Sequence, residues 1–384
     1  MRIGIDARAI LNPEKSAPSG VAHYVWHLVK NILEIDRDNQ YVLFFDFKVR
    51  EKDVKKFTRP NVKIKFFPFS DYKKYMPGAY SEILGLATLV REKLDVLHVT
   101  SPLYRVPATY RGKIVTTFYD FAPWRVPDLF PKLSTAKIKT LYKFAAKKSD
   151  RIIAVSESTR KDAKELLGYP EKDVAVVLNG VDRRFFEPVS SSLEEVKKFY
   201  GVKNKYILFL GTLEPRKNLS RVLEAFARFK NSFRGSFDYQ LIVAGKRGWL
   251  FREYFQQAED LGIRDEVIFT GYVGGDELQP LYTHAEFFVM PSLWEGFGQT
   301  IVEAMACGAP CLVSRVASIP EVAGDAALYV DPRDTDGIAK AMGKLDRDRE
   351  LRVELKRRGR KQAQKFSWSK CACETLEVYN SLGK

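Results

Sequence analysis

The sequence has little cysteine and lacks any long apolar segment, and each absence excludes a class of protein. No stretch of about 18 uncharged apolar residues occurs, so we expect no membrane-spanning helix. The N-terminal residues reach a carboxylate at Asp6 before a secretory apolar region could form, which favours a cytoplasmic protein. The four cysteines are spaced C-x3-C and C-x-C. These spacings match zinc sites poorly, so we interpret the cysteines as reduced thiols.

Positive charge is in excess and is unevenly distributed. The 63 Lys and Arg residues against 48 Asp and Glu give a formal net charge of +15. Residues 1–190 hold 34 basic and 22 acidic side chains, whereas the rest of the chain holds 29 and 26. A basic first half suggests an anionic partner: nucleic acid, a phosphorylated substrate or anionic lipid. Because the chain has neither an RNA-recognition motif nor zinc-finger spacing, we expect no nucleic-acid partner.

The apolar residues form short runs that alternate with helical patterns, which is typical of an α/β fold with parallel sheets. The chain is 45% apolar over 384 residues. Two domains are expected, because single cores seldom grow past roughly 250–300 residues. The predicted strands are 2–6, 41–45, 62–66, 96–99, 114–117, 152–155 and 174–178 in the first half, and 206–210, 241–244, 267–270, 287–290, 311–314 and 327–330 in the second.

The domain boundary is predicted where this alternation weakens, between residues 182 and 204. That stretch contains Pro188 and three consecutive serines. We therefore predict an N-terminal domain over 1–188 and a C-terminal domain over 200–362. A final helix over 363–384 is expected to pack back toward the N-terminal domain. In doubly wound domains ligands bind beyond the carboxyl ends of the strands.

The first motif that carries chemistry is Gly211-Thr-Leu-Glu-Pro-Arg-Lys-Asn218, between a predicted strand and a predicted helix. A helix N-terminus offers unpaired amides and partial positive charge to an anion. Arg216 and Lys217 add two full charges, and an arginine can bind two phosphate oxygens at once. These features predict a diphosphate site, with a solvated basic turn as the alternative. A P-loop is excluded, because it needs Gly in place of Arg216 and Ser or Thr in place of Asn218.

The second motif is Glu295-Gly-Phe-Gly-Gln-Thr-Ile-Val-Glu303, which leads from a strand into a helix. Its glycines let the backbone approach a ligand closely. Glu295 in the loop and Glu303 in the helix can face one ligand from two sides. Because a carboxylate only accepts hydrogen bonds, it suits paired sugar hydroxyls. The alternative is that Glu303 complements the helix dipole and Glu295 is solvated. A dinucleotide fingerprint is excluded, since Ile301 stands where its third glycine is needed.

With both motifs present, the chain resembles the retaining glycosyltransferases of family 4, and most closely their mannosyltransferase B-like branch. The resemblance covers nearly the whole chain. It implies the GT-B fold: two Rossmann-like doubly wound domains facing each other across a cleft, with a nucleotide sugar bound mainly by the second. It rests on residues 2–8, Ser156-Glu-Ser-Thr159, Asn179-Gly-Val-Asp182, the two motifs above and Ser318-Ile-Pro-Glu321.

The resemblance also implies roles for individual residues. Arg216 and Lys217 match the diphosphate-binding pair of the family. Glu303 matches the carboxylate that holds the ribose hydroxyls, and Glu295 matches the carboxylate that faces the transferred sugar. Further implied donor contacts are Gly20 in a first-domain loop, Gly211, the base-contacting pair Tyr272 and Val273, and the backbone of Gly296, Phe297, Gly298, Gln299 and Thr300.

One position departs from the family pattern. The family usually has His-Asp where this chain has Tyr119-Asp120, and that histidine normally contacts the donor sugar or its phosphate. A tyrosine can still donate a hydrogen bond but carries no charge near neutral pH. Either Tyr119 makes the contact or the site is shifted by one residue. Of the four histidines, His98 on a predicted strand is interpreted as structural, whereas His23 follows Gly20 and is a second candidate for the cleft.

The predicted chemistry needs no cofactor. Departure of the sugar builds negative charge on the nucleoside diphosphate, which Arg216, Lys217 and helix-terminal amides can stabilise. We therefore expect no required metal, and we interpret the Asp-x-Asp triplets at 36–38, 334–336 and 346–348 as solvated turns. The family reaction retains the anomeric configuration. The nucleotide sugar is then a substrate, and the second substrate is a glycan or lipid-linked acceptor.

The basic first domain suggests a membrane surface as a further partner. Over residues 132–148, four lysines form one stripe of a predicted helix and Ile138, Leu141, Tyr142 and Ala145 form another. Such a basic amphipathic helix can lie on an anionic membrane. This favours a peripheral location at the inner membrane face. The alternative is an ordinary surface helix that packs its apolar side on its own domain.

The sequence thus predicts transfer of a hexose, with mannose from GDP-mannose as the first choice. Transfer from a UDP-sugar that carries glucose, galactose or N-acetylhexosamine is the alternative. A third hypothesis is an inactive nucleotide-sugar-binding subunit, which the missing histidine suggests. The acceptor is not readable from the sequence.

Overall fold

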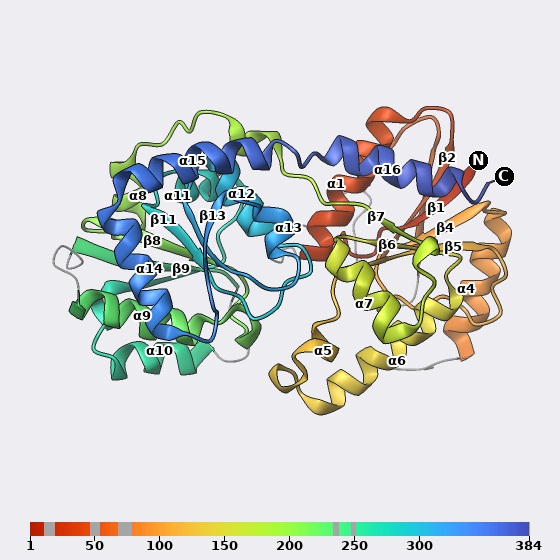
Figure 1. Ribbon diagram of the computed structural model, residues 1–384. Coiled ribbons are helices and arrows are strands. Elements are labelled where there is room, and N and C mark those ends of the chain that lie inside the picture. Colours follow the sequence, from red (N-terminus) through yellow and green to blue (C-terminus); the bar gives the residue numbers. More distant parts are fainter. Residues whose placement is uncertain (11–19, 47–53, 68–78, 233–237, 247–250, 384) are drawn as a thin grey trace. The chain divides into compact units, whose positions relative to one another are not determined.

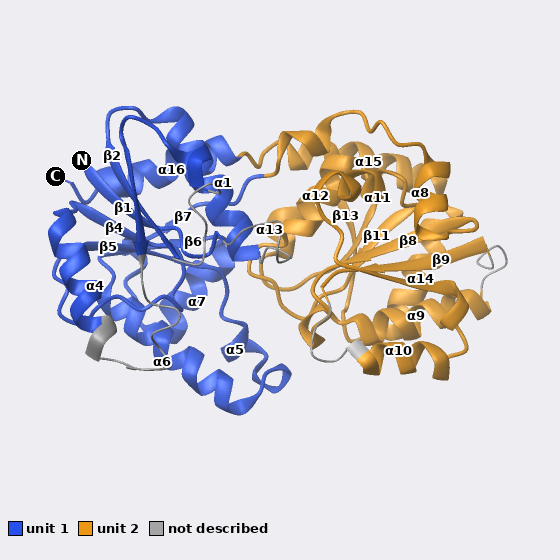
Figure 2. Ribbon diagram, turned by 180° about the vertical axis from the view of Figure 1, so that it is seen from behind, with its two compact units in different colours: residues 1–180, 368–384 blue, residues 181–367 orange. Residues whose placement is uncertain are grey.

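The computed structural model describes residues 1–10, 20–46, 54–67, 79–232, 238–246 and 251–383. The chain forms two compact units (Figure 2). Unit 1 contains residues 1–180 and 368–384, and unit 2 contains residues 181–367. Residues 11–19 of the first-domain loop that leads to Gly20 lie outside the described residues. Among the described helices, none combines the length and the apolar character that crossing a membrane requires.

Unit 1 is built on a seven-stranded sheet with the order β3-β2-β1-β4-β5-β6-β7, in which each neighbouring pair is parallel (Figure 1). The order reverses between β1 and β4, which makes their carboxyl ends the switch point of this sheet. The strands are β1 (Arg2–Asp6), β2 (Gln40–Asp46), β3 (Val62–Phe67), β4 (Val96–Val99), β5 (Lys113–Phe118), β6 (Arg151–Ala154) and β7 (Val174–Val176).

Helices cover both faces of this sheet because its strands are apolar on both sides. On one face Val42 and Phe44 pack against Leu89, and on the other His98 contacts Tyr379. Figure 1 shows α1 and α16 side by side along the second face. The helices are α1 (Gly20–Ile35), α4 (Ala79–Glu92), α5 (Ala122–Arg125), α6 (Lys132–Lys148), α7 (Glu157–Leu167) and α16 (Trp368–Asn380), with 3-10 turns η1 (Lys55–Phe57), η2 (Pro127–Leu129) and η3 (Glu171–Asp173).

Unit 2 is built on a six-stranded parallel sheet with the order β10-β9-β8-β11-β12-β13. Its switch point lies between β8 and β11. The strands are β8 (Lys205–Leu210), β9 (Tyr239–Ala244), β10 (Val267–Gly271), β11 (Phe287–Met290), β12 (Cys311–Ser314) and β13 (Ala327–Val330).

Helices cover both faces of the second sheet as well. Those of one face, α9, α10 and α14, pack over Ile207, Phe209 and Leu241, which are fully buried (Figure 1). The helices are α8 (Leu193–Tyr200), α9 (Leu219–Ser232), α10 (Phe251–Asp260), α11 (Leu278–Thr283), α12 (Gln299–Cys307), α13 (Ile319–Ala323), α14 (Thr335–Arg347) and α15 (Arg349–Ala363). The 3-10 turns are η4 (Arg183–Phe186), η5 (Pro215–Lys217), η7 (Arg264–Glu266) and η8 (Gly275–Glu277).

The two doubly wound Rossmann-like domains of the prediction are confirmed by these sheets. Every predicted strand segment coincides with a strand, although β7 ends at Val176 rather than at residue 178. That each domain faces the other across a cleft stays a prediction.

The domain limits differ from the predicted ones. The first unit ends at Gly180, not at residue 188, because Phe185 packs on Tyr282 of unit 2 with ring centroids 6.2 Å apart. The stretch interpreted as a weakly patterned boundary contains helix α8, which begins with a capping box between Ser192 and Glu195. At the other end the chain leaves unit 2 after Ser367, and α16 packs against α1 in unit 1.

The helix predicted for a membrane surface packs its apolar side on its own unit. In α6, Tyr142 and Ala145 are buried in a cluster with Phe118 and Phe121, and Ile138 is half-buried against it. The apolar stripe is therefore not available to lipid. Of the two interpretations, the one in which the helix packs its apolar side on its own domain is correct for this stripe. Contact of the exposed lysines with anionic lipid stays a prediction.

Candidate functional site

The predicted donor residues of unit 2 gather at the switch point of its sheet. Strands β8 and β11 are hydrogen-bonded neighbours, with Ile207 opposite Phe287. The loops that follow these strands start at the same edge of the sheet. The loop after β8 carries the motif of residues 211–218, and the loop after β11 carries Glu295 and leads into α12. The backbone amide of Leu293 donates to the carbonyl of Arg216 at 2.8 Å, which joins the two loops directly.

The centre of this site is a buried ion-pair cluster. Lys217 Nζ lies 2.6 Å from Glu295 Oε1, and Arg216 Nη1 lies 3.0 Å from Glu295 Oε2. Arg216 also pairs with Glu214, Nη2 to Oε1 at 2.5 Å, and donates to the carbonyl of Trp294 at 2.7 Å. The structure thus brings Glu295 together with two residues that precede it by 79 and 78 positions in the chain.

The Glu295 carboxyl keeps its negative charge at neutral pH. Burial alone would raise the pKa of the Glu295 carboxyl, but Lys217 and Arg216 lower it to about 2. Glu295 and Glu214 therefore balance the two cations.

Serine hydroxyls fix the position of Glu295. Ser292 Oγ donates to Glu295 Oε1 at 2.7 Å, and Ser318 Oγ donates to the Glu295 carbonyl at 2.9 Å. Both serines are fully buried. Neither role was predicted, although Ser318 belongs to a segment that carried the resemblance. A serine's contact depends on the loop conformation, which no spacing pattern reports.

Asn218 is a further residue that the sequence reasoning left without a role. Its backbone is left-handed, with φ of 65°, and its side chain is 3% exposed. Nδ2 donates to the carbonyls of Pro291 and Pro332 at 2.9 and 2.7 Å. One side chain therefore joins the loops after β8, β11 and β13 beside Lys217. Asparagine adopts the left-handed conformation more readily than most residues, so its presence at the end of the motif could have predicted this turn.

The glycine-containing part of the second motif starts helix α12. Gly298 is its N-cap with φ of 95°, a conformation that favours glycine. Phe297 is buried, and the Thr300 hydroxyl donates to Met290 Sδ at 3.2 Å. The first amides of α12, at Gln299 and Thr300, stand at the carboxyl edge of the sheet, where helix amides favour an anion.

Glu303 lies one turn into α12, in surroundings unlike those of Glu295. It is 5% exposed, and Tyr282 Oη donates to its Oε2 at 3.2 Å. Burial raises the pKa of Glu303 to about 7, although hydrogen bonds from Gln299 and Tyr282 act in the opposite direction. Tyr282 is a supporting residue that the sequence analysis did not identify.

Gly211, Tyr272 and Val273 complete the predicted contacts of unit 2. Gly211 directly follows β8, and Gly245 approaches it so closely that a Cβ on Gly245 would lie 1.8 Å from the Gly211 carbonyl oxygen. Tyr272 and Val273 follow β10; Val273 is buried, whereas Tyr272 is half exposed. Gly296 sits between Glu295 and Phe297 in the loop before α12.

Gly20, Tyr119 and Asp120 belong to unit 1, so a shared site with unit 2 stays a prediction. Gly20 is the first residue of α1. The Tyr119 hydroxyl donates to the Thr100 carbonyl at 2.6 Å, which already uses its one proton. Asp120 Oδ1 accepts from the Ala122 amide at 3.0 Å and so starts α5.

The remaining histidines and cysteines fall outside this site. His98 is fully buried between Tyr379 and Thr117, at 2.6 and 2.8 Å, as expected for a structural histidine. His23 lies in unit 1, and its ring is 5.8 Å from that of Trp368. Among the described residues, the four cysteines are free, and no three His, Cys, Asp or Glu side chains are placed to hold a metal ion.

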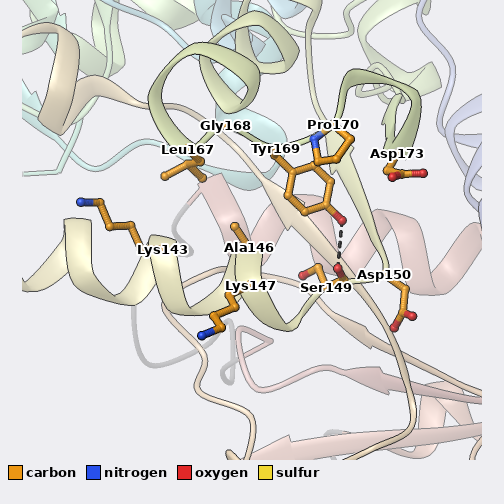
Figure 3. Close-up of a pocket in the computed structure, with 10 residues that line it drawn as sticks. All are labelled: Lys143, Ala146, Lys147, Ser149, Asp150, Leu167, Gly168, Tyr169, Pro170 and Asp173. Atoms are coloured by element: carbon orange, nitrogen blue, oxygen red, sulfur yellow. Dashed lines mark hydrogen bonds between the residues drawn. The ribbon is translucent and has the colours of Figure 1, made fainter.

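A separate cavity of about 370 Å³ lies in unit 1, where the ends of α6 and α7 meet (Figure 3). Lys143, Lys147, Asp150 and Asp173 line it together with apolar groups, and Tyr169 donates to the Ser149 carbonyl at 2.9 Å within it. It contains none of the predicted site residues.

Comparisons with known proteins identify the family of this chain. Residues 18–185 match the family model "Glycosyltransferase Family 4", and residues 193–362 match "Glycosyl transferases group 1". O-antigen chain mannosyltransferase B of Escherichia coli is 34% identical over 272 residues, 70% of this chain and 71% of that protein. The serotype-specific mannosyltransferase WbdA of Escherichia coli is 31% identical over 61% of this chain, which spans 29% of WbdA.

Solved structures match the fold over nearly the whole chain. HepE of Anabaena, in complex with UDP and glucose, has a TM-score of 0.77 at 18% identity and covers 99% of this chain and 100% of its own. WaaG, a glycosyltransferase involved in lipopolysaccharide biosynthesis, has a TM-score of 0.76 at 15% identity, with 98% and 99% covered. These likenesses concern the GT-B fold alone. From the family models and the relatives, the chain belongs to glycosyltransferase family 4, in its mannosyltransferase-like branch, and is an enzyme that transfers a sugar.

Proposed function

We propose that this enzyme transfers mannose from GDP-mannose to a glycan or lipid-linked acceptor, with retention of the anomeric configuration. The observation that carries the proposal is the cluster of Arg216, Lys217 and Glu295 at the switch point of the second sheet. Two cations beside a helix N-terminus suit the diphosphate of a nucleotide sugar.

The choice of mannose is supported by the names of relatives. Both Escherichia coli relatives are mannosyltransferases, and the first is matched over 71% of its length. UDP-sugars remain the second candidate, because N-acetyl-alpha-D-glucosaminyl L-malate synthase of Bacillus anthracis is 30% identical over 75% of each chain. A bacterial polysaccharide or its lipid-linked precursor is the acceptor class that the O-antigen relatives suggest.

The chemical step follows from where charge develops. As the sugar leaves, its bond to the diphosphate breaks and negative charge grows on the outer phosphate. Lys217, Arg216 and the first amides of α12 are already in position before the reaction. They stabilise that charge as it develops, which lowers the barrier. The acceptor hydroxyl then attacks the anomeric carbon on the face that the diphosphate leaves, and its proton passes to the departing phosphate oxygen. With two protein cations in this role, we propose that no divalent metal is required.

Glu295 and Glu303 have different roles in this scheme. Glu303 accepts from the ribose hydroxyls of the donor. Glu295 faces the transferred sugar and also holds Lys217 and Arg216 in position until the diphosphate arrives. Its engagement with both cations, at 2.6 and 3.0 Å, supports the second role.

A donor panel tests the proposal. The full chain is mixed with GDP-mannose, UDP-glucose, UDP-galactose, UDP-N-acetylglucosamine and ADP-glucose, and the melting temperature is measured, because a ligand that favours the folded state raises it. GDP-mannose should give the largest rise. Release of GDP with a mannosylated acceptor, measured with and without EDTA, then tests transfer and metal independence, and NMR of the product tests retention.

The variant Lys217→Ala tests whether the reaction takes place at this site. It should lower kcat about 100-fold or more, by analogy with loss of one oxyanion-stabilising group. Lys340→Ala, an exposed lysine on α14, is the control and should leave turnover unchanged. Wild-type kinetics in Lys217→Ala would place the site elsewhere, and binding without any transfer would favour the inactive subunit.

A further inference from the structure

Arg184 lies in unit 2 next to the predicted ribose-binding carboxylate, and none of the predicted roles uses it. It belongs to η4, which packs against α12. Its guanidinium carbon is 4.9 Å from the ring centroid of Phe185, and Phe185 packs on Tyr282 with centroids 6.2 Å apart. Tyr282 in turn donates to Glu303. A continuous set of contacts therefore holds Arg184 beside Glu303.

The guanidinium of Arg184 has hydrogen-bond donors to spare. Its buried Nε has no hydrogen-bond partner among the described residues. The paired carboxylate, Asp182, is 3.9 Å from Nε, beyond hydrogen-bond distance, and accepts instead from the Arg184 amide at 3.1 Å. Because an arginine has five N–H donors and no acceptor, a ligand that satisfies it must present acceptors. The side chain as a whole is 37% exposed, so a ligand can reach the part of it that lies beyond the buried Nε.

Electrostatics connects Arg184 with two predicted donor contacts. Burial raises the pKa of Glu303, and the charge of Arg184 acts against that rise. Burial likewise raises the pKa of Tyr272; Arg184 lowers it, and Glu303 raises it. Arg184, Tyr272 and Glu303 are thus close enough to feel one another's charge, and they come from η4, the end of β10 and α12.

Tyr272 offers an aromatic surface at this place. Half of the residue is exposed, although it is a large apolar side chain. Its hydroxyl lies over Gly274, where a Cβ would be only 2.6 Å from Oη, so the absence of a side chain at 274 lets the ring lie there. Any nucleobase can stack on such a ring, which gives affinity without selecting the base.

We propose that Arg184 reads the base of the donor nucleotide, donating to its edge while Tyr272 stacks on its face, and that this pair selects guanine. The inference rests on the proposed function, because Glu303 must hold the ribose for the base to reach Arg184.

Guanine is the base that fits a donor-only side chain. It presents two neighbouring acceptors, O6 and N7, to which one guanidinium can donate twice. Adenine presents N7 beside an amino donor, which an arginine cannot satisfy. Uracil places its carbonyl acceptors on either side of an N–H donor. Arg184 therefore favours GDP over ADP and UDP, and supplies a physical reason for a GDP-sugar donor.

Calorimetric titration of the full chain with GDP, 7-deaza-GDP, ADP and UDP tests this. Arg184→Met keeps the apolar stem on Phe185 but removes all donors. It should weaken GDP binding about tenfold, the effect of losing one bidentate base contact. It should also abolish the preference for GDP over 7-deaza-GDP, which lacks N7, and leave ADP and UDP binding unchanged. Arg183→Met, at the exposed neighbouring arginine of η4, is the matched control and should bind GDP as the wild type does.

Two results would overturn the inference. Equal weakening of GDP, ADP and UDP by Arg184→Met, in a variant with an unchanged melting temperature, would assign Arg184 to the ribose or phosphates. Unchanged GDP binding would remove it from the site. Failure of the proposed function is distinguishable: the wild type would bind none of these nucleotides, or Lys217→Ala would bind them as tightly as the wild type.

Discussion

Two glutamates of one motif, Glu295 and Glu303, are eight residues apart and each 5% exposed. Their surroundings shift the pKa values of the two carboxyls in opposite directions. Glu295 faces two cations, which lower its pKa to about 2, whereas at Glu303 burial outweighs the hydrogen bonds from Gln299 and Tyr282 and raises the pKa to about 7. Desolvation acts on both carboxylates: the ion pairs with Lys217 and Arg216 outweigh it at Glu295, whereas the charge of Arg184 and the hydrogen bonds from Gln299 and Tyr282 do not outweigh it at Glu303. The same burial therefore gives a permanent charge at one position and a titrating group at the other.

The raised pKa of Glu303 predicts a pH dependence of donor binding. A carboxylate accepts from both ribose hydroxyls, whereas a protonated carboxyl has lost part of that capacity. As pH rises from 6 to 8 through the pKa of about 7, Glu303 becomes ionised. The Kd of GDP-mannose should then fall by about tenfold, the change expected for one titrating group that must be ionised. Fluorescence or calorimetric titration at each pH measures this, and the diester diphosphate of the sugar nucleotide does not itself titrate there.

Glu303→Gln is the control for that titration. It keeps the shape and one acceptor but cannot ionise, so its Kd should be weaker than that of the wild type at pH 8 and flat between pH 6 and 8. A pH slope that persists in Glu303→Gln would assign the titration to another group and would remove Glu303 from the ribose contact.

At the scale of elements, the site depends on loops that adjoin at one sheet edge and on one side chain that joins them. Asn218 ends η5 in a left-handed conformation and donates to the carbonyls of Pro291 and Pro332. The loops after β8 and β11 are also joined by the Leu293 amide and by the ion pairs of Arg216 and Lys217 with Glu295. Since Lys217 and Glu295 are flanked by these points, their separation is set by the loops rather than by either strand alone.

Asn218→Asp is therefore expected to damage both stability and turnover. The carboxylate keeps the size but loses both donors, and its charge faces two carbonyl oxygens. Loss of buried partners costs about 1–3 kcal/mol each. We therefore expect the free energy of unfolding to fall by at least about 2 kcal/mol. We expect kcat to fall at least about tenfold, because Lys217 is displaced from the position in which it contacts the diphosphate. Urea unfolding and steady-state kinetics measure the two effects.

Arg221→Ala is the control for Asn218, since Arg221 Nη1 donates to the Asn218 Oδ1 acceptor at 3.0 Å and its loss leaves both donors of Asn218 in place. It should cost less than about 1 kcal/mol and leave kcat unchanged. A normal kcat in a destabilised Asn218→Asp would show that Asn218 supports the fold without positioning Lys217.

What sequence reasoning could reach at this scale has a physical limit. Strands such as β8 and β11 were predictable because buried parallel strands read as short apolar runs, and the carboxyl-edge rule placed the motifs that follow them where ligands bind. The ion pair between Lys217 and Glu295 was not predicted. The partners of Asn218 were not predictable, because a side chain that joins three loops leaves no periodic pattern. Helix α8 was missed for a related reason: it is one short, polar element whose capping box stands next to Pro188 and a serine run.

At the scale of the whole molecule, the chain begins and ends in unit 1 and forms unit 2 in between. Helix α16 completes unit 1 by covering the face of the sheet on which His98 lies. Tyr379 on α16 is fully buried, and its hydroxyl is 2.6 Å from His98 Nδ1 on β4. Burial lowers the pKa of His98 to about 3, so the ring is neutral and its two nitrogens need one donor and one acceptor. Tyr379 and Thr117 supply these partners.

Tyr379→Phe should therefore destabilise unit 1 while leaving the nucleotide site of unit 2 intact. The variant leaves one buried nitrogen of His98 without a partner, at a cost of about 1–3 kcal/mol. Hydrogen exchange should accelerate in β4, β5 and α16, with exchange in β8, β11 and α12 and the Kd of GDP unchanged. Cys373→Ser, at an exposed position of α16, is the control and should exchange as the wild type does. Accelerated exchange in both units, or a weakened Kd, would mean that α16 stabilises the molecule as a whole rather than the unit whose sheet it covers.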